Sequence, residues 1–457
     1  MQTVPAASKA DWERLVIGAL GEKPLSSLDA EIAEGVSVPP LSPATTMRPL
    51  WSRGGASWTR LAWLDRADSA ALASALATGA DGVALVLGGA PAAASGGIAP
   101  PALAALLQHI ELDRCAVRFS AGVAADEVFT AVRAALAQAR LDAGRVSIAF
   151  GLDPFGALAA GLIDPAAIDD TLTALAEAAV RNIGEGHRGP ILSADARLAH
   201  AAGGDAVDEL AFALAGRAAL LRRLDSAGLA PARLADAVDV ALAADVDQFV
   251  TIAKFRAMRL LDARLLAAAG LPPSALRLHG ETSTRMLAAI DSRSNIIRAT
   301  IAALSAALGG ADSLTILPWS LVGPADADAH RLALTTQAIL AEEAGLARVD
   351  DPAAGSGTID GITLALAHAA WTAFQRIEEA GGLAASLTAG TMQRRIIASA
   401  RAAEERLAGG EATIIGVTLH RPSGEAPAHS PTPPPPARGF VPLVASRRAA
   451  SFEGESA

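Results

Sequence analysis

The fold is decided by residues 238–317, which read VDVALAADVDQFVTIAKFRAMRLLDARLLAAAGLPPSALRLHGETSTRMLAAIDSRSNIIRATIAALSAALGGADSLTIL. Three short apolar runs in this stretch, at residues 238–244, 275–279 and 313–317, have the length and composition of strands. Between them lie longer stretches such as residues 295–308, where apolar side chains recur with the period of a helix. Strands that alternate with helices in this way predict parallel βαβ units.

Five more apolar runs continue the alternation on both sides of this stretch. They lie at residues 83–87, 115–120, 146–150, 191–194 and 346–350. Eight strand–helix repeats over about 270 residues match the size of an eightfold barrel. The sequence therefore predicts an α/β protein with a parallel (β/α)8 TIM barrel that begins near residue 80. The alternative is an open doubly wound sheet, but no strand candidate leads through a glycine-rich loop into a helix, as that fold would favour.

Two flanking segments lie outside this repeat. Residues 1–47 contain a helical pattern at 11–20 and then several prolines, which predicts an extended N-terminal arm that contacts another subunit. The barrel and its C-terminal helices are predicted over residues 48–420, with a last strand at 412–417. Residues 421–457 are rich in proline and predict a linker and tail.

The composition disfavours several classes of protein. The chain carries 38 Lys and Arg against 48 Asp and Glu, a net charge of −10, which disfavours nucleic acid as a partner. Cys115 is the single cysteine, so an intramolecular disulfide or a cysteine metal cluster is excluded. The uncharged residues 82–110 are interrupted by glycines and prolines and do not predict a membrane span. With no visible signal peptide, we expect a cytoplasmic protein without a membrane segment.

Neither a glycine-rich stretch nor the histidines predict a ligand site. Residues 184–189 spell GEGHRG, the spacing of a dinucleotide-binding loop, but they follow a helix and precede a strand, which is the wrong context. The eight histidines show none of the spacings typical of metal ligands, so no metal site is predicted.

A polar cluster follows the strand predicted at residues 275–279 and is the strongest candidate site. Its members are Arg277, His279, Glu281, Thr282 and Ser283. In a barrel, the carboxyl ends of the strands build the ligand site, so these side chains could contact a ligand. The alternative is a capped loop, in which Thr282 or Ser283 is the N-cap of the next helix. The residues alone leave both interpretations open.

Several long segments resemble the methylmalonyl-CoA mutase family. RLHGETSTRMLAAIDSRSNIIRATIAALSAALGGADSL, at 277–314, is similar to that family's segment RTHSQTSGWSLTxQDxYNNxxRTxIEAMAAxxGGTQSL. DPAAGSGTIDGITLALAHAAWTAFQRIEEAGG, at 351–382, resembles DPxxGSxYVExLTxxLAxxAWxxIxEIExxGG. DVDQFVTIAKFRAMRLL, at 245–261, is similar to the family's FxEVAKLRAARxLW helix. With weaker likenesses in the arm and near the end, the resemblance extends from Trp12 to about Val417.

The resemblance implies a fold and a reaction. Members of the family fold as an eightfold barrel joined to a C-terminal cobalamin-binding domain. Acyl-CoA threads the barrel and adenosylcobalamin caps it, and methylmalonyl-CoA is isomerised to succinyl-CoA by a radical mechanism.

Departures from the family pattern bear on catalysis. The catalytic Tyr-His pair aligns with Arg197 and Leu198, and the glutamine of HSQTS becomes Glu281. The segment at 313–317 lacks the His and Asn of the family's SLHTN, and His330 stands in only the first half of a DxHxxG cobalamin motif. Residues 149–161, AFGLDPFGALAAG, resemble the small subunit of heterodimeric mutases more than the catalytic chain.

The resemblance therefore implies a small, non-catalytic subunit that lacks the cobalamin-binding domain. We expect no catalytic, cofactor-binding or metal-binding residue in this chain, and a vestigial acyl-CoA site at the polar cluster named above. A large subunit would be the partner and would hold adenosylcobalamin. One alternative is a catalytic barrel half whose cobalamin domain is a separate chain; another is a non-enzymatic scaffold or an unrelated barrel hydrolase.

Overall fold

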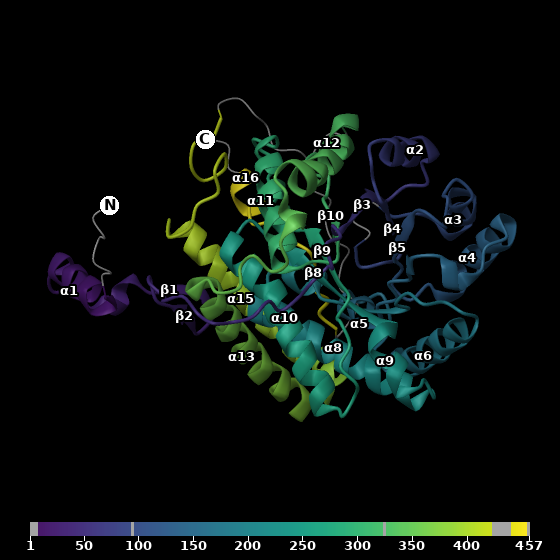
Figure 1. Cartoon of the computed structure of the whole chain (residues 1–457), viewed down its shortest axis with the longest axis horizontal. Coiled ribbons are helices and arrows are strands. Elements are labelled where there is room, and N and C mark those ends of the chain that lie inside the picture. Colours follow the sequence, from purple (N-terminus) through teal and green to yellow (C-terminus); the bar gives the residue numbers. More distant parts are fainter. Residues whose placement is uncertain (1–7, 93–95, 323–325, 423–439, 455–457) are drawn as a thin grey trace.

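The computed structural model describes residues 8–92, 96–322, 326–422 and 440–454. Helices surround a central parallel sheet, and a thin N-terminal arm extends from this body (Figure 1). Within the described residues, no helix is long and apolar enough to cross a membrane. A cytoplasmic location stays a prediction.

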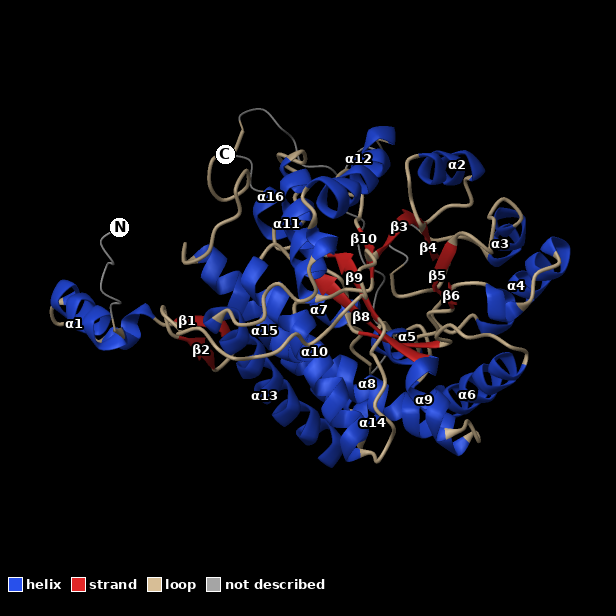
Figure 2. Ribbon diagram, in the orientation of Figure 1, coloured by secondary structure: helices blue, strands red, loops and turns tan. Residues whose placement is uncertain are grey.

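Eight parallel strands form the central sheet (Figure 2). Their order is β6-β5-β4-β3-β10-β9-β8-β7. Consecutive strands pair from β3 to β6 and from β7 to β10, and the first strand of this sheet, β3, pairs with the last, β10. The strands are β3 (Thr59–Leu64), β4 (Gly82–Val86), β5 (Ala116–Ser120), β6 (Ile148–Ala149), β7 (Leu192–Asp195), β8 (Val238–Ala244), β9 (Leu278–Thr282) and β10 (Ser313–Thr315).

The seam between β6 and β7 is bridged just past the end of β6. Leu152 forms a parallel bridge with Leu192, and the Ser193 amide donates to the Leu152 carbonyl at 2.8 Å. The Phe150 amide donates to the Pro190 carbonyl at 2.9 Å. These bonds connect the two ends of the sheet, so the predicted eightfold β/α barrel is confirmed.

The predicted start of the barrel is wrong. The first strand is β3, which begins at Thr59 rather than near residue 80. Arg60 interrupts its apolar pattern, but the guanidinium is held outside the barrel by Asp81, with Nε and Nη2 each 2.9 Å from the carboxylate. The pairing lets a strand carry a charged residue without burying an unpaired charge.

Two predicted strands are absent. Residues 346–350 contain only the short helix η6 (Leu346–Arg348) and form no strand. Val349 is 56% exposed, as expected for a residue that does not belong to the sheet. Residues 412–417 form turns with one bridge, between Ile415 and Leu419. Both runs are apolar enough for a strand, but neither pairs with a strand of the barrel. Apolar content alone does not form a ladder.

The helices that follow the strands bury alanine-rich faces against the sheet. They are α2 (Ser69–Ala77), α3 (Pro100–Leu107), α4 (Ala125–Ala139), α6 (Ile168–Gly184), α8 (Ala206–Ser226), α10 (Gln248–Ala268), α11 (Ser294–Gly309) and α12 (Ala327–Ala338). Ala211, Ala213 and Ala215 of α8 are at most 1% exposed. Such small side chains let the helix backbones approach the sheet closely, which is how a chain poor in aromatic residues fills its core.

Three short helices occupy the carboxyl ends of the strands. They are α5 (Pro154–Ala159) after β6, α7 (Arg197–Ala201) after β7 and η4 (Thr284–Met286) after β9. Asp153 caps α5 through the Gly156 amide, and Ser283 caps η4 through the Arg285 amide. These caps fix the polar residues at the strand ends.

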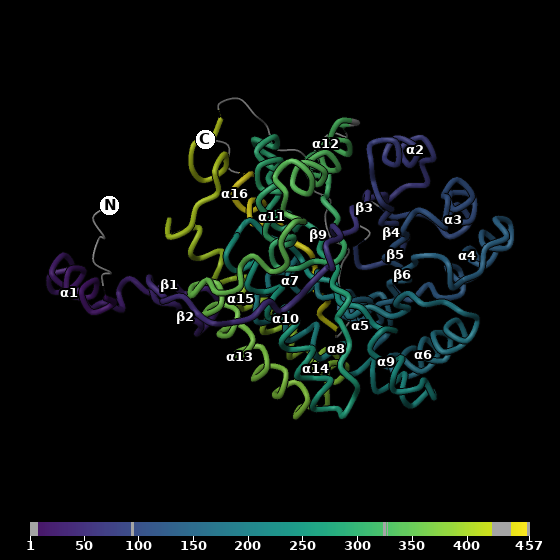
Figure 3. Tube along the Cα trace, viewed as in Figure 1, coloured from purple at the N-terminus to yellow at the C-terminus, as the bar shows by residue number. Residues whose placement is uncertain are grey.

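The described part of the N-terminal arm contains α1 (Lys9–Leu20), which confirms the helix predicted at 11–20. Ser8 and Asp11 form a capping box at its start. The short helix η1 (Leu25–Leu28) and the hairpin β1 (Ala30–Ala33) and β2 (Val36–Val38) follow. In the trace, α1 lies away from the barrel (Figure 3).

The C-terminal helices are α13 (Gly357–Glu379), α14 (Gly382–Thr388), α15 (Thr391–Ala408) and α16 (Ala450–Glu453). Most of the predicted proline-rich linker, residues 423–439, lies outside the described residues. The division into 1–47, 48–420 and 421–457 stays a prediction.

Candidate functional site

The five residues of the predicted polar cluster do not lie together. His279, Glu281 and Thr282 belong to β9 itself; His279 and Thr282 are buried and Glu281 is partly buried, whereas Arg277 precedes the strand and is exposed at the other end of the barrel. The polar stretch was predicted to follow a strand, but His279 and Glu281 belong to the strand and contact polar and charged groups of the lumen. The capped-loop interpretation holds for Ser283. Ligand contacts by these residues stay a prediction.

One buried ion pair crosses the lumen near the amino ends of the strands. Arg118 of β5 pairs with Asp239 of β8, and their side chains are 5% and 4% exposed. The Arg118 guanidinium also lies 3.3 Å from Ser193 Oγ of β7. His279 contacts Ser313 of β10, with Nδ1 2.9 Å from Oγ. Polar groups from five strands thus occupy the axis at this level.

A second set of charges crosses the lumen nearer the carboxyl ends. The Arg197 guanidinium lies 2.9 Å from Asp195, 3.1 Å from Ser120 Oγ and 2.7 Å from Glu281. Burial raises the pKa of Asp195, but the adjacent Arg197 outweighs it and the pKa is lowered overall. Arg197 is therefore a paired guanidinium inside the lumen.

Asp153 lies beside this set and is 4% exposed. Its Oδ1 accepts the Gly156 amide at 3.0 Å. Burial first, and then the neighbouring Asp195 carboxylate, raise the pKa of Asp153 well above its usual value. A carboxyl whose pKa is higher in the folded chain holds its proton on folding, so stability falls as the pH rises from the unfolded pKa towards the folded one.

The Asp153→Asn variant is therefore expected to become more stable relative to the wild type as the pH rises. Asparagine still accepts the Gly156 amide but has no charge to bury, so the difference grows by up to about 1.4 kcal/mol per pH unit above about pH 4. Chemical denaturation at several pH values measures this. Asp164→Asn, at the exposed N-cap of η3 (Pro165–Ala167), is the matched control. A constant difference between Asp153→Asn and wild type would contradict the prediction.

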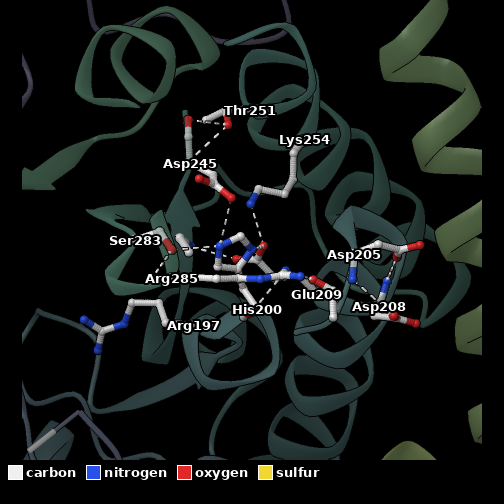
Figure 4. Close-up of polar contacts among 12 residues, drawn as sticks. Arg197, His200, Asp205, Asp208, Glu209, Asp245, Thr251, Lys254, Ser283 and Arg285 are labelled. Carbon is white, nitrogen blue, oxygen red and sulfur yellow. Dashed lines mark hydrogen bonds and ion pairs between the residues drawn. The ribbon is translucent and has the colours of Figure 1, made fainter. Parts of the chain in front are cut away.

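A third cluster of charges lies at the rim of the barrel (Figure 4). His200 of α7 contacts Ser283 Oγ through Nε2 at 2.9 Å, and its Nδ1 lies 3.4 Å from Glu209. Asp245, just past β8, lies 3.4 Å from Nε2. Lys254 of α10 pairs with Glu209, and both are almost fully buried. We call His200, Glu209, Asp245, Lys254, Ser283 and Arg285 the rim cluster.

The order Ser283, His200, Glu209 superficially matches a nucleophile, a base and an orienting acid. The remaining contacts argue against that chemistry. Ser283 Oγ already accepts the Arg285 amide, and Glu209 is held by Lys254 and by the Ala243 amide at 2.6 Å. Ser283 is only 4% exposed, so a substrate carbonyl has no access to its hydroxyl. The cluster is arranged to join α7, α8, β8 and α10.

Sequence reasoning missed most of the rim cluster. Glu209 and Lys254 are charged residues in stretches of α8 and α10 whose buried positions are mostly apolar, which was the available signal. Arg285 donates to the Gly204 carbonyl at 2.9 Å, and burial lowers its pKa to about 10. Among the described residues, no group of three or more His, Cys, Asp or Glu side chains is arranged to hold a metal ion.

The fold and the lumen together define a parallel β/α barrel whose axis is filled with paired charges. A family model described as methylmalonyl-CoA mutase matches residues 101–435. The chain belongs to the methylmalonyl-CoA mutase family.

Several relatives with assigned names are similar to the chain. A methylmalonyl-CoA mutase small subunit from Streptomyces virginiae is 40% identical over 57% of this chain and 42% of its own length. The small subunit from Propionibacterium freudenreichii subsp. shermanii is 32% identical over 70% of this chain and 50% of its own. The large subunit from the same organism is 34% identical over 50% of this chain and 32% of its own. The chain spans about half the length of the small subunits it matches.

Proposed function

We propose that this chain is the small subunit of a heterodimeric, adenosylcobalamin-dependent methylmalonyl-CoA mutase and that it contributes no catalytic side chain. Its partner is a large subunit that carries the active site and holds the cofactor. The similarity to small subunits from two genera supports the choice of subunit. The assembled enzyme isomerises methylmalonyl-CoA to succinyl-CoA.

The obstructed lumen is the observation that carries this proposal. An acyl-CoA that threads the barrel would have to pass Arg118–Asp239 and then Arg197–Glu281, both of which lie across the axis. The cavity at the amino end, with a volume of about 160 Å³, is lined by Arg118, Asp239 and His279. Separating a buried ion pair costs several kcal/mol, roughly 3–5 per pair. This cost disfavours the alternative of a catalytic barrel half.

The residues at the carboxyl end of the barrel do not fit adenosylcobalamin. Arg197 and Leu198 replace the side chains that the family places near the reacting groups. His200 is 5% exposed and already bonded to Ser283, so its imidazole is not presented at the barrel surface. His330 stacks on Trp63 with ring centroids 6.1 Å apart. We therefore assign no step of the reaction to this chain.

The arm supplies a surface for the large subunit. Helix α1 has no buried residue, and Leu15 and Ile17 are 71% and 51% exposed. A 12-residue helix without tertiary packing is marginal in water, so this one needs a surface to bury its apolar side chains. Trp12, on the same helix, is an aromatic anchor of the kind that dominates interfaces.

Co-purification with the tagged large subunit tests the proposal. The wild-type chain is expected to be retained and to support mutase turnover. Trp12→Ala is expected to weaken retention by more than tenfold, because truncating such an anchor often costs about 2 kcal/mol or more. Val349→Ala, at a side chain that is 56% exposed on another surface, is the control.

Two results would count against this assignment. If the wild-type chain is not retained by the large subunit, the subunit assignment is wrong. If Trp12→Ala lowers the melting temperature but leaves the subunit stoichiometry unchanged, the arm packs on its own barrel and is not the interface.

A further inference from the structure

The described C-terminal residues, 440–454, run across the carboxyl end of the barrel. The Leu443 amide donates to the Ala159 carbonyl of α5 at 2.7 Å, and the Ser446 amide donates to the Ala201 carbonyl of α7 at 2.8 Å. The Arg448 amide donates to the Arg285 carbonyl of η4 at 3.0 Å. These acceptors follow β6, β7 and β9, so one segment joins three loops of the same barrel face. We call residues 440–454 the strap.

The strap is packed as well as hydrogen-bonded. Leu443 is 3% exposed and belongs to the main hydrophobic core, and Ala449 is 1% exposed. Gly161, which has a φ of +72°, lies beneath Pro442, and a Cβ at this position would be 3.3 Å from the proline ring. The glycine therefore provides both the left-handed turn after α5 and the room for the strap.

One charged contact ties the strap to the rim cluster. Arg448 Nη2 lies 2.8 Å from Asp245 Oδ2, and Asp245 is the carboxylate that also faces His200. The Asp245 side chain is 6% exposed and the Arg448 side chain 32% exposed. Farther along, Glu453 is buried and accepts the Ala289 and Ile290 amides after η4. The strap thus covers the rim cluster and continues beyond it.

We propose that the strap is a built-in cover that closes the carboxyl end of this barrel, with the Arg448–Asp245 pair as its electrostatic tie. A ligand the size of a corrin reaches the ends of β6, β7 and β9 only after the strap has detached from these loops. The strap therefore keeps cofactor off this barrel, independently of the residues that line the lumen. The inference rests on contacts within this chain and holds whether or not the partner proposed above is correct.

Hydrogen–deuterium exchange on the full chain tests the proposal. Peptides covering residues 440–454 are expected to exchange slowly in the wild type, although they lie on the surface, because carbonyls of the barrel loops accept their amides. Arg448→Gln should accelerate exchange of these peptides by roughly fivefold to tenfold, since it removes a partly exposed, charge-assisted bond. Peptides from β8 and α8 should be unchanged. Arg401→Gln, at an exposed position on α15, is the matched control.

The same samples are then mixed with an excess of adenosylcobalamin. In the wild type, the corrin absorption bands and the exchange of strap peptides are expected to stay unchanged. Fast hydrogen–deuterium exchange of the strap peptides in the wild type, or equal exchange in Arg448→Gln and Arg401→Gln, would contradict the proposed role of the Arg448–Asp245 pair. A change in the corrin absorption bands with the wild-type chain would contradict the proposal that the strap keeps the cofactor off the barrel. All these measurements use the isolated chain, so they can fail while assembly with a large subunit succeeds.

Discussion

Arg256→Ala is expected to lower the free energy of unfolding by about 3–5 kcal/mol, the typical result of removing one partner of a buried ion pair. Arg256 of α10 is fully buried. Its Nε lies 2.8 Å from Asp351 and its Nη1 lies 2.8 Å from Asp360. The variant leaves two carboxylates without their cation in a site that water does not reach.

The position of these carboxylates explains the size of the effect. Asp351 also accepts the Leu50 amide at 2.8 Å, and Asp360 accepts the Gly355 amide at 2.9 Å. Thr45 of the segment before the barrel donates to Asp360 as well. The single guanidinium of Arg256 therefore joins α10 to α13 and to the chain that leads into β3.

Equilibrium denaturation of the full chain measures the loss. Arg264→Ala is the matched control, because Arg264 lies on the same helix, is exposed, and stacks on the Trp371 ring at 4.0 Å. An exposed cation–π contact is worth about 0.5–1 kcal/mol, so the control should lose no more than that. A similar small loss for both variants would show that Arg256 is not a structural centre.

Much of the barrel could be predicted because its strands are buried on both faces. The runs at 83–87, 115–120 and 238–244 contain mostly apolar residues and coincide with β4, β5 and β8. The prediction failed where polar residues face the lumen or lie at a strand edge. Arg60 obscured β3, and the HGET residues of β9 read as a loop although they form a strand whose polar side chains pair across the axis.

The site was harder to predict because its pairs join distant parts of the chain. Lys254 and Glu209 are 45 residues apart, and Arg448 and Asp245 are 203 residues apart. Neither spacing corresponds to a helical or strand period, so only the fold brings them together. The resemblance to a known family predicts that Arg197 stands where catalytic members have a tyrosine, but the pairing of this guanidinium with Glu281 depends on the register of β7 and β9.

Arg118→Ala is expected to be as damaging to stability as Arg256→Ala, with a loss of about 3–5 kcal/mol, because it leaves Asp239 charged and buried in the lumen. The double variant Arg118→Leu/Asp239→Leu should recover most of that loss. Two leucines replace the pair with apolar groups of comparable volume, and such exchanges are often neutral or stabilising, by about 1–4 kcal/mol. Arg114→Ala, two residues before β5 and with a side chain that is 80% exposed, is the control.

The double variant also separates a structural role of the lumen from a catalytic one. If the charges only fill and close the axis, a complex of the large subunit with the double variant turns over methylmalonyl-CoA at the wild-type rate per assembled heterodimer. Denaturation curves and the stoichiometry of the purified complex establish folding and assembly before turnover is measured. A large fall in turnover in a fully assembled complex would mean that the lumen of this barrel takes part in the reaction. The charges would then have to act on a bound group, because Arg118 and Asp239 are 4% and 3% exposed and reach no surface that a partner could contact.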